Sequence, residues 1–163
     1  MRTRLPQRRH PYRLPRQEYQ RPGTPMFVTT NTHTGVHLTD EGVVKVLMEA
    51  MGRIGRRRGT RVNAYCLMPD HIHLVLSVVA DGGDMERWLT YWKRETAKVL
   101  GQPGMWQRSF WDRHARDDED VVGMVEYVLH NPVRRRLCES WTDWPHSWSQ
   151  WHPKTIGTDP NLQ

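Results

Sequence analysis

The 163-residue sequence has little cysteine and no long run of apolar residues. Its two cysteines, Cys66 and Cys138, do not form a CxxC pair, so the sequence indicates neither a zinc ribbon nor a disulfide framework. No apolar stretch approaches the roughly 18 residues of a membrane span, and no apolar signal-peptide region follows the basic N-terminus. We therefore expect a cytoplasmic protein that does not enter a membrane.

Lysine is also scarce, although the chain carries a net charge of +6. Arginine supplies nearly all of the positive charge, and the lysines are Lys45, Lys93, Lys98 and Lys154. A guanidinium group pairs bidentately with phosphate oxygens, so this preference favours a partner that carries phosphate. Charge alone leaves a generally basic protein as the alternative.

The length suits one compact domain with tails. Residues 1–25 combine many arginines and prolines with a single acid, Glu18, which predicts an extended basic arm. We place the folded domain at 26–133 and a C-terminal tail at 134–163. Tryptophans recur in that tail at helical spacing, which favours packing on the domain over a base-stacking platform; they are Trp141, Trp144, Trp148 and Trp151.

Apolar periodicity predicts an alternating order of strands and helices. The predicted strands cover 26–32, 61–67, 72–79 and 106–114, and the predicted helices cover 41–52, 84–100 and 117–130. The arginine-rich stretch at 53–58 is expected to be a turn. This order is typical of a ferredoxin-like α/β (α+β) fold, an antiparallel sheet with helices packed on one face.

Two histidines begin the strand expected at 72–79. Alternation along a strand puts His71 and His73 on one face and Ile72 on the other. Two neutral imidazoles are a partial ligand set for a divalent metal. Two exposed or hydrogen-bonded histidines are the alternative, because the motif is short.

Tyr127 and Asn131 lie four residues apart at the end of the last predicted helix. That spacing places the phenol and the amide on one helix face, one turn apart. The pattern alone equally allows a core tyrosine and an asparagine that caps the helix before Pro132.

Longer blocks of sequence decide between these alternatives. The runs CLMPDHIHLVL, WQRSFWDRHAR and EYVLHNPVRRRL, followed by WTDWPHSW, resemble the REP-associated tyrosine transposases, a branch of the single-tyrosine HUH transposases. The resemblance extends from Phe27 to Trp148 in the same order. It implies that 26–133 is a catalytic domain acting on single-stranded DNA.

The resemblance also implies a role for each candidate. His71, His73 and Asn131 would hold a divalent metal, Mg²⁺ or Mn²⁺, and Tyr127 would be the nucleophile. The expected activity is cleavage and rejoining of single-stranded DNA at hairpins formed by imperfect palindromes, through a 5′-phosphotyrosine. Relatives from mobile elements act as dimers and the REP-associated branch resembles monomers, so both states stay open.

Several arginines are candidates for phosphate contact, with solvated surface as the alternative. They are Arg8, Arg9, Arg56, Arg57, Arg58, Arg113, Arg134, Arg135 and Arg136. Arg113 stands where the family often has histidine, and His114 is expected on the opposite face of the strand. A non-catalytic hairpin-binding protein and a nuclease that uses activated water are the rival functions.

Overall fold

The structure is a computed structural model that describes residues 14–33 and 35–162. Arg8, Arg9 and the rest of the basic arm up to residue 13 lie outside the described residues. The helices are α1 (Glu41–Arg58), α2 (Met85–Val99), α3 (Asp118–Leu129) and α4 (Asn131–Arg134). The strands are β1 (Met26–Asn31), β2 (Thr60–Leu67), β3 (His71–Val78), β4 (Trp111–His114) and β5 (Ser147–Ser149). Short 3-10 turns are η1 (Arg16–Gln20), η2 (Trp141–Asp143) and η3 (Pro160–Leu162).

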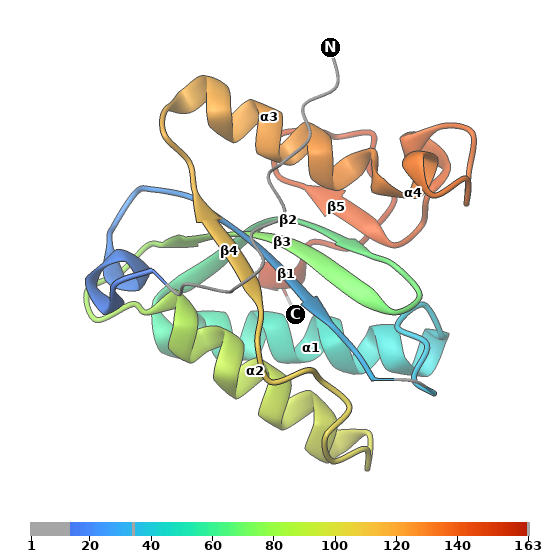
Figure 1. The fold of residues 1–163 in the computed structure, drawn as a ribbon, viewed down its shortest axis with the longest axis horizontal. Coiled ribbons are helices and arrows are strands. Elements are labelled where there is room, and N and C mark those ends of the chain that lie inside the picture. Colours follow the sequence, from blue (N-terminus) through green and yellow to red (C-terminus); the bar gives the residue numbers. More distant parts are fainter. Residues whose placement is uncertain (1–13, 34, 163) are drawn as a thin grey trace.

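One five-stranded antiparallel sheet organises the chain, in the order β4-β1-β3-β2-β5 (Figure 1). The α/β class and the antiparallel sheet predicted from the sequence are confirmed. Strand β5 comes from the segment that we described as a tail, and it pairs with β2 through Ala64↔Ser149 and Cys66↔Ser147. Among the described residues, no helix is long and apolar enough to cross a bilayer.

The helices cover both faces of the sheet, which corrects our expectation of one covered face. Helices α1 and α2 pack on the face formed by Met26, Val28 and Leu74, whereas α3 packs on the face of Phe27 and Val75 (Figure 1). The cause lies in β2 and β3, whose side chains are almost all buried on both sides. Strands that are apolar on both faces require cover on both faces.

Two boundaries also differ from the predictions. The arginines at 53–58 lie in the last turns of α1 and not in a turn after it. Cations at this end are favoured by the helix dipole, and Gly59 ends the helix at a φ of 58°. The last strand is shorter than predicted, because only 111–114 pairs continuously with β1.

The C-terminal tryptophans lie in turns and in β5. Trp141 and Trp144 pack beside α3, Trp148 packs against the core on the other face, and Trp151 is 45% exposed. The packing interpretation is confirmed for Trp141, Trp144 and Trp148.

Candidate active site

The two histidines of β3 face one another on the α3 side of the sheet. His71 and His73 are both buried, and their Nε2 atoms lie 3.1 Å apart. The pairing of Asn31 with His71 and Thr29 with His73 sets their position beside the end of β1. The structure thus brings both predicted ring nitrogens to one point.

Each imidazole is oriented by a hydrogen bond at its other nitrogen. His71 Nδ1 lies 2.6 Å from Asp70 Oδ1, and His73 Nδ1 lies 2.8 Å from Thr29 Oγ1. An oxygen that accepts the Nδ1 proton leaves the Nε2 lone pair free, which is the arrangement found around metal-binding histidines. The hydrogen bond from His71 also holds the pKa of Asp70 below its usual value.

His73 is held in its neutral form. Burial, followed by the charges of His71, Arg134 and Arg135, lowers the pKa of His73 to about 3. A neutral imidazole is the form that ligates a metal, so His73 needs no deprotonation at neutral pH.

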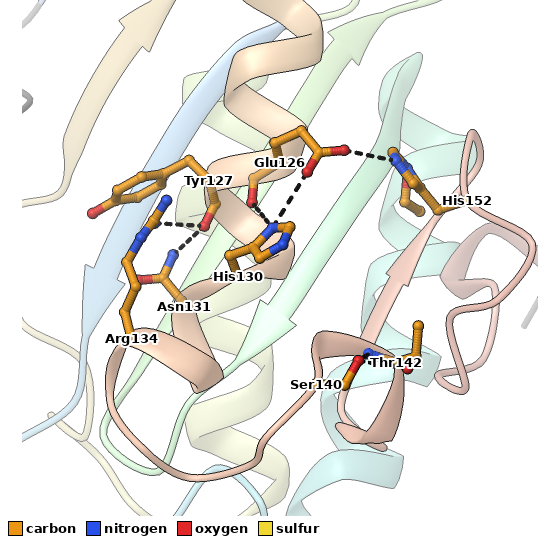
Figure 2. Close-up of polar contacts among 9 residues, drawn as sticks. Glu126, Tyr127, His130, Asn131, Arg134, Ser140, Thr142 and His152 are labelled. Atoms are coloured by element: carbon orange, nitrogen blue, oxygen red, sulfur yellow. Dashed lines mark hydrogen bonds and ion pairs between the residues drawn. The ribbon is translucent and has the colours of Figure 1, made fainter. Parts of the chain in front are cut away.

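Tyr127 lies in α3 and Asn131 is the first residue of α4, one helical turn further along the chain (Figure 2). The ring of Tyr127 lies edge-on to both neighbours, with centroids 5.8 Å from His73 and 5.6 Å from Phe27. Asn131 is buried, and its Nδ2 donates to the Tyr127 carbonyl over 2.7 Å. The Asn131 side chain lies close enough to His73 to raise the pKa of that imidazole, against the larger lowering caused by burial. All four predicted residues are therefore neighbours.

The donor set fits a divalent metal. It comprises two imidazole nitrogens and one amide oxygen, with open positions for substrate oxygens. No group of three histidine, cysteine, aspartate or glutamate side chains that could hold a metal occurs in the part of the chain that the structure describes. The third candidate donor is the amide of Asn131, which the resemblance implied and which a search for histidine, cysteine and carboxylate groups does not detect.

Two arginines after α3 border the same site. The guanidinium carbon of Arg134 lies 4.3 Å from the centre of the Tyr127 ring, and the group donates to the Tyr127 carbonyl over 3.1 Å. Arg135 lines a cavity of about 550 Å³ with Asp70 and His71. Arg136 follows, exposed, at a φ of 58°.

The cluster at Arg56–58 lies elsewhere. It occupies the end of α1, on the opposite face of the sheet from the histidines. Arg58 stacks over the ring of Tyr91 at 3.9 Å, and Arg56 donates to the carbonyl of Asn161. The structure does not bring these residues to the site, and their contact with DNA stays a prediction.

Arg113 forms an ion pair within the protein, with Asp120 of α3. Its guanidinium binds both carboxylate oxygens of Asp120 at 2.7–3.0 Å, and both side chains are more than three-quarters buried. Arg113 pairs with Phe27 on the α3 face, whereas His114 pairs with Met26 beside the other core, as the strand alternation predicted. The sequence did not reveal Asp120 or Thr29 as partners, because both contacts depend on how distant segments pair.

Removing the charge of Asp120 is expected to destabilise the fold. Burial opposes its ionisation, but the hydrogen bonds and charges of Arg113 and Arg116 together outweigh burial, and the pKa of Asp120 falls below 3.8. Asp120→Asn should lose about 1–3 kcal/mol of unfolding free energy at pH 7. A lowered folded pKa stabilises fully above pH 3.8, so the difference from wild type should shrink as the pH falls through the folded value.

Urea unfolding at pH 7 and below pH 3.8 measures this effect. The matched control is Asp118→Asn in the same exposed first turn, which should change stability by no more than about 0.5 kcal/mol. Equal losses in both variants would contradict a specific role for Asp120.

Comparison with known proteins finds relatives of this chain. The profile of the family described as "Transposase IS200 like" matches residues 26–128. A candidate REP-associated tyrosine transposase of Haemophilus influenzae is 28% identical over 120 residues, which cover 61% of this chain and 68% of the relative. The REP-associated tyrosine transposase of Escherichia coli K12 is 28% identical over 104 residues, covering 63% of this chain and 62% of the relative.

A solved structure shares the fold. It is a REP-associated tyrosine transposase bound to a REP hairpin, with a TM-score of 0.72 and 25% sequence identity. The similarity covers 79% of this chain and 78% of that one. The chain spans about two thirds of the length of the two curated relatives.

Proposed function

Because the chain belongs to the IS200-like transposase family, we propose that it cleaves and rejoins single-stranded DNA beside hairpins, with Tyr127 as the nucleophile. The observation that carries the proposal is that Tyr127 of α3 and Asn131 at the start of α4 lie beside His73, whose Nε2 faces that of His71. Buried titratable groups gathered at one point are typical of functional sites.

His71, His73 and Asn131 would hold a divalent metal, Mg²⁺ or Mn²⁺, near the scissile phosphate. The metal would supply Lewis-acid stabilisation of the charge that develops on the phosphate oxygens. Asp70 and Thr29 keep both ligand nitrogens turned toward this point.

Tyr127 would form and later release the covalent link. Its phenolic oxygen bonds to phosphorus while the bond from phosphorus to the 3′-oxygen breaks, and the proton that the phenol loses is balanced by the one that the 3′-oxygen takes up. The products are a 5′-phosphotyrosine and a free 3′-hydroxyl. Another 3′-hydroxyl can reverse the step without ATP, because the link keeps the energy of the phosphodiester.

Arg134 and Arg135, which border the site, would contact the phosphates of the DNA backbone. Arg134 and Arg135 place positive charge over Tyr127 and in the cavity next to His71, where phosphates on either side of the break would lie. The solved relative is described as bound to a REP hairpin. We infer that this chain also takes a hairpin with a single-stranded flank.

The direct test is a search for protein-linked DNA. Hairpin oligonucleotides from the DNA that flanks the gene, labelled at the 3′ end, are incubated with the protein and Mg²⁺ or EDTA and run on a denaturing gel. The proposal predicts a labelled protein band with Mg²⁺ and none with EDTA. Hairpin binding without any adduct would instead support a non-catalytic binding protein.

A further inference from the structure

The helix that carries Tyr127 rests on the sheet through apolar side chains. Met124, Val125, Val128 and Leu129 of α3 are buried against Phe27, Val75 and their neighbours. The hydrophobic effect itself is not directional, whereas hydrogen bonds and ion pairs are. Polar contacts at the ends of α3 therefore add directional restraints to this packing.

Helix α3 makes such contacts toward both edges of the sheet. Near its first turn, Asp120 binds Arg113 of the edge strand β4. Near its last turn, Glu126 binds His152, which follows the other edge strand, β5. Figure 1 shows α3 lying above the sheet, from the loop after β4 to the side where β5 lies. The helix is thus tied to both edges.

The contact at the nucleophile end is a small cluster around Glu126 (Figure 2). One carboxylate oxygen lies 3.2 Å from His152 Nε2, and the other lies 3.3 Å from His130 Nδ1. The ring of Trp141 packs beside both imidazoles, with centroids 5.6 Å from His152 and 6.0 Å from His130. Ser149 Oγ of β5 lies 3.2 Å from His152 Nδ1 and orients that ring.

We propose that His152 is a positioning residue for the reaction, because it ties the helix of the nucleophile to the C-terminal edge of the sheet through Glu126. This inference rests on the proposed function of Tyr127. Glu126 directly precedes Tyr127 in α3, so a contact that holds Glu126 also restrains the backbone that carries the phenol. On the sheet side, Cys66 of β2 pairs with both Ser147 of β5 and His73 of β3. We call the contact between Glu126 and His152 the clamp. Through β5 and β2, it connects the helix of Tyr127 to β3, the strand that carries His71 and His73.

The clamp is expected to act on rate more than on stability. The side chains of Glu126 and His152 are 46% and 24% exposed, and ion pairs at such positions add little to stability. A displacement of about 1 Å at a reacting atom, by contrast, costs on the order of 100-fold in rate. A single variant can therefore lose reaction rate without a comparable loss of stability.

The test compares His152→Ala with His152→Gln in the full chain. Adduct formation on 3′-labelled hairpin DNA is measured at saturating DNA, together with the affinity for DNA and for Mn²⁺. His152→Ala should slow adduct formation by about tenfold to 100-fold, with both affinities within about twofold of wild type. His152→Gln should retain most of the rate, because its amide can donate to Glu126 from nearly the same place.

Lys154→Ala, an exposed change in the same segment, is the control and should match wild type. Hydrogen exchange gives a second readout that needs no activity: His152→Ala should exchange faster at the amides in the last turn of α3. A wild-type rate in His152→Ala, or an equal fall in rate and both affinities, would overturn the clamp while leaving Tyr127 as the nucleophile. Absence of an adduct with the wild type would overturn the proposed function and this inference together.

Discussion

The variant Tyr127→Phe is expected to form no covalent complex with DNA and to lose cleavage by at least about 1000-fold. The phenolic oxygen is the only atom that the substitution removes. The phenyl ring keeps its edge-on contacts with His73 and Phe27, so the helix stays in place. The loss should therefore appear in the chemical step and not in hairpin affinity. The measurement is the 3′-labelled adduct on a denaturing gel, beside a binding titration of the same hairpin.

The matched control is Tyr91→Phe. Tyr91 is 39% exposed on α2, and its ring lies beneath Arg58 on the face away from the histidines. The same atom is removed there, and adduct formation should stay at the wild-type rate. DNA cut by Tyr127→Phe without any protein-linked product would contradict the tyrosine mechanism and support a nuclease that uses activated water.

The second large effect concerns the metal. His73→Ala removes a buried nitrogen of the proposed ligand set and is expected to weaken Mn²⁺ binding by at least about 100-fold. Thr29→Val keeps that ligand but removes the hydroxyl at its Nδ1, and it should weaken binding by about tenfold. Isothermal titration of the DNA-free protein with Mn²⁺ gives both values and requires no activity.

His37→Ala is the control for this series. His37 is exposed at the rim of the cavity beside His71, so it should leave Mn²⁺ affinity unchanged. A loss in His37→Ala as large as that in His73→Ala would show that the metal sits in the cavity and not between His71 and His73. Unaltered binding in His73→Ala would reject the proposed ligand set.

The parts of the site that the sequence predicted are those that depend on local geometry. A strand puts His71 and His73 on one face, and one helical turn puts Tyr127 beside Asn131, whatever the rest of the fold does. The meeting of the two pairs did not follow from spacing. It was expected only because ordered blocks of sequence resemble a known family, and in the structure the ring of Tyr127 lies beside that of His73.

The parts that the sequence did not predict depend on long-range packing. Both α1 and α3 have buried apolar faces, and periodicity does not say which side of a sheet such a face will cover. Arg113 was expected to be a phosphate ligand, because its partner Asp120 becomes visible only when α3 docks beside β4. Strand β5 was not predicted for the same reason. The spacing of the tryptophans around it resembles that of a helix, whereas its pairing with β2 depends on residues far away in the sequence.

The two edges of the sheet are short, since β4 has four residues and β5 has three. An edge strand exposes backbone groups that another chain can pair with, and shortness limits how many are offered. Two copies of this protein would therefore gain little by pairing their sheets edge to edge. The two edge strands that border α3 thus offer little backbone for aggregation.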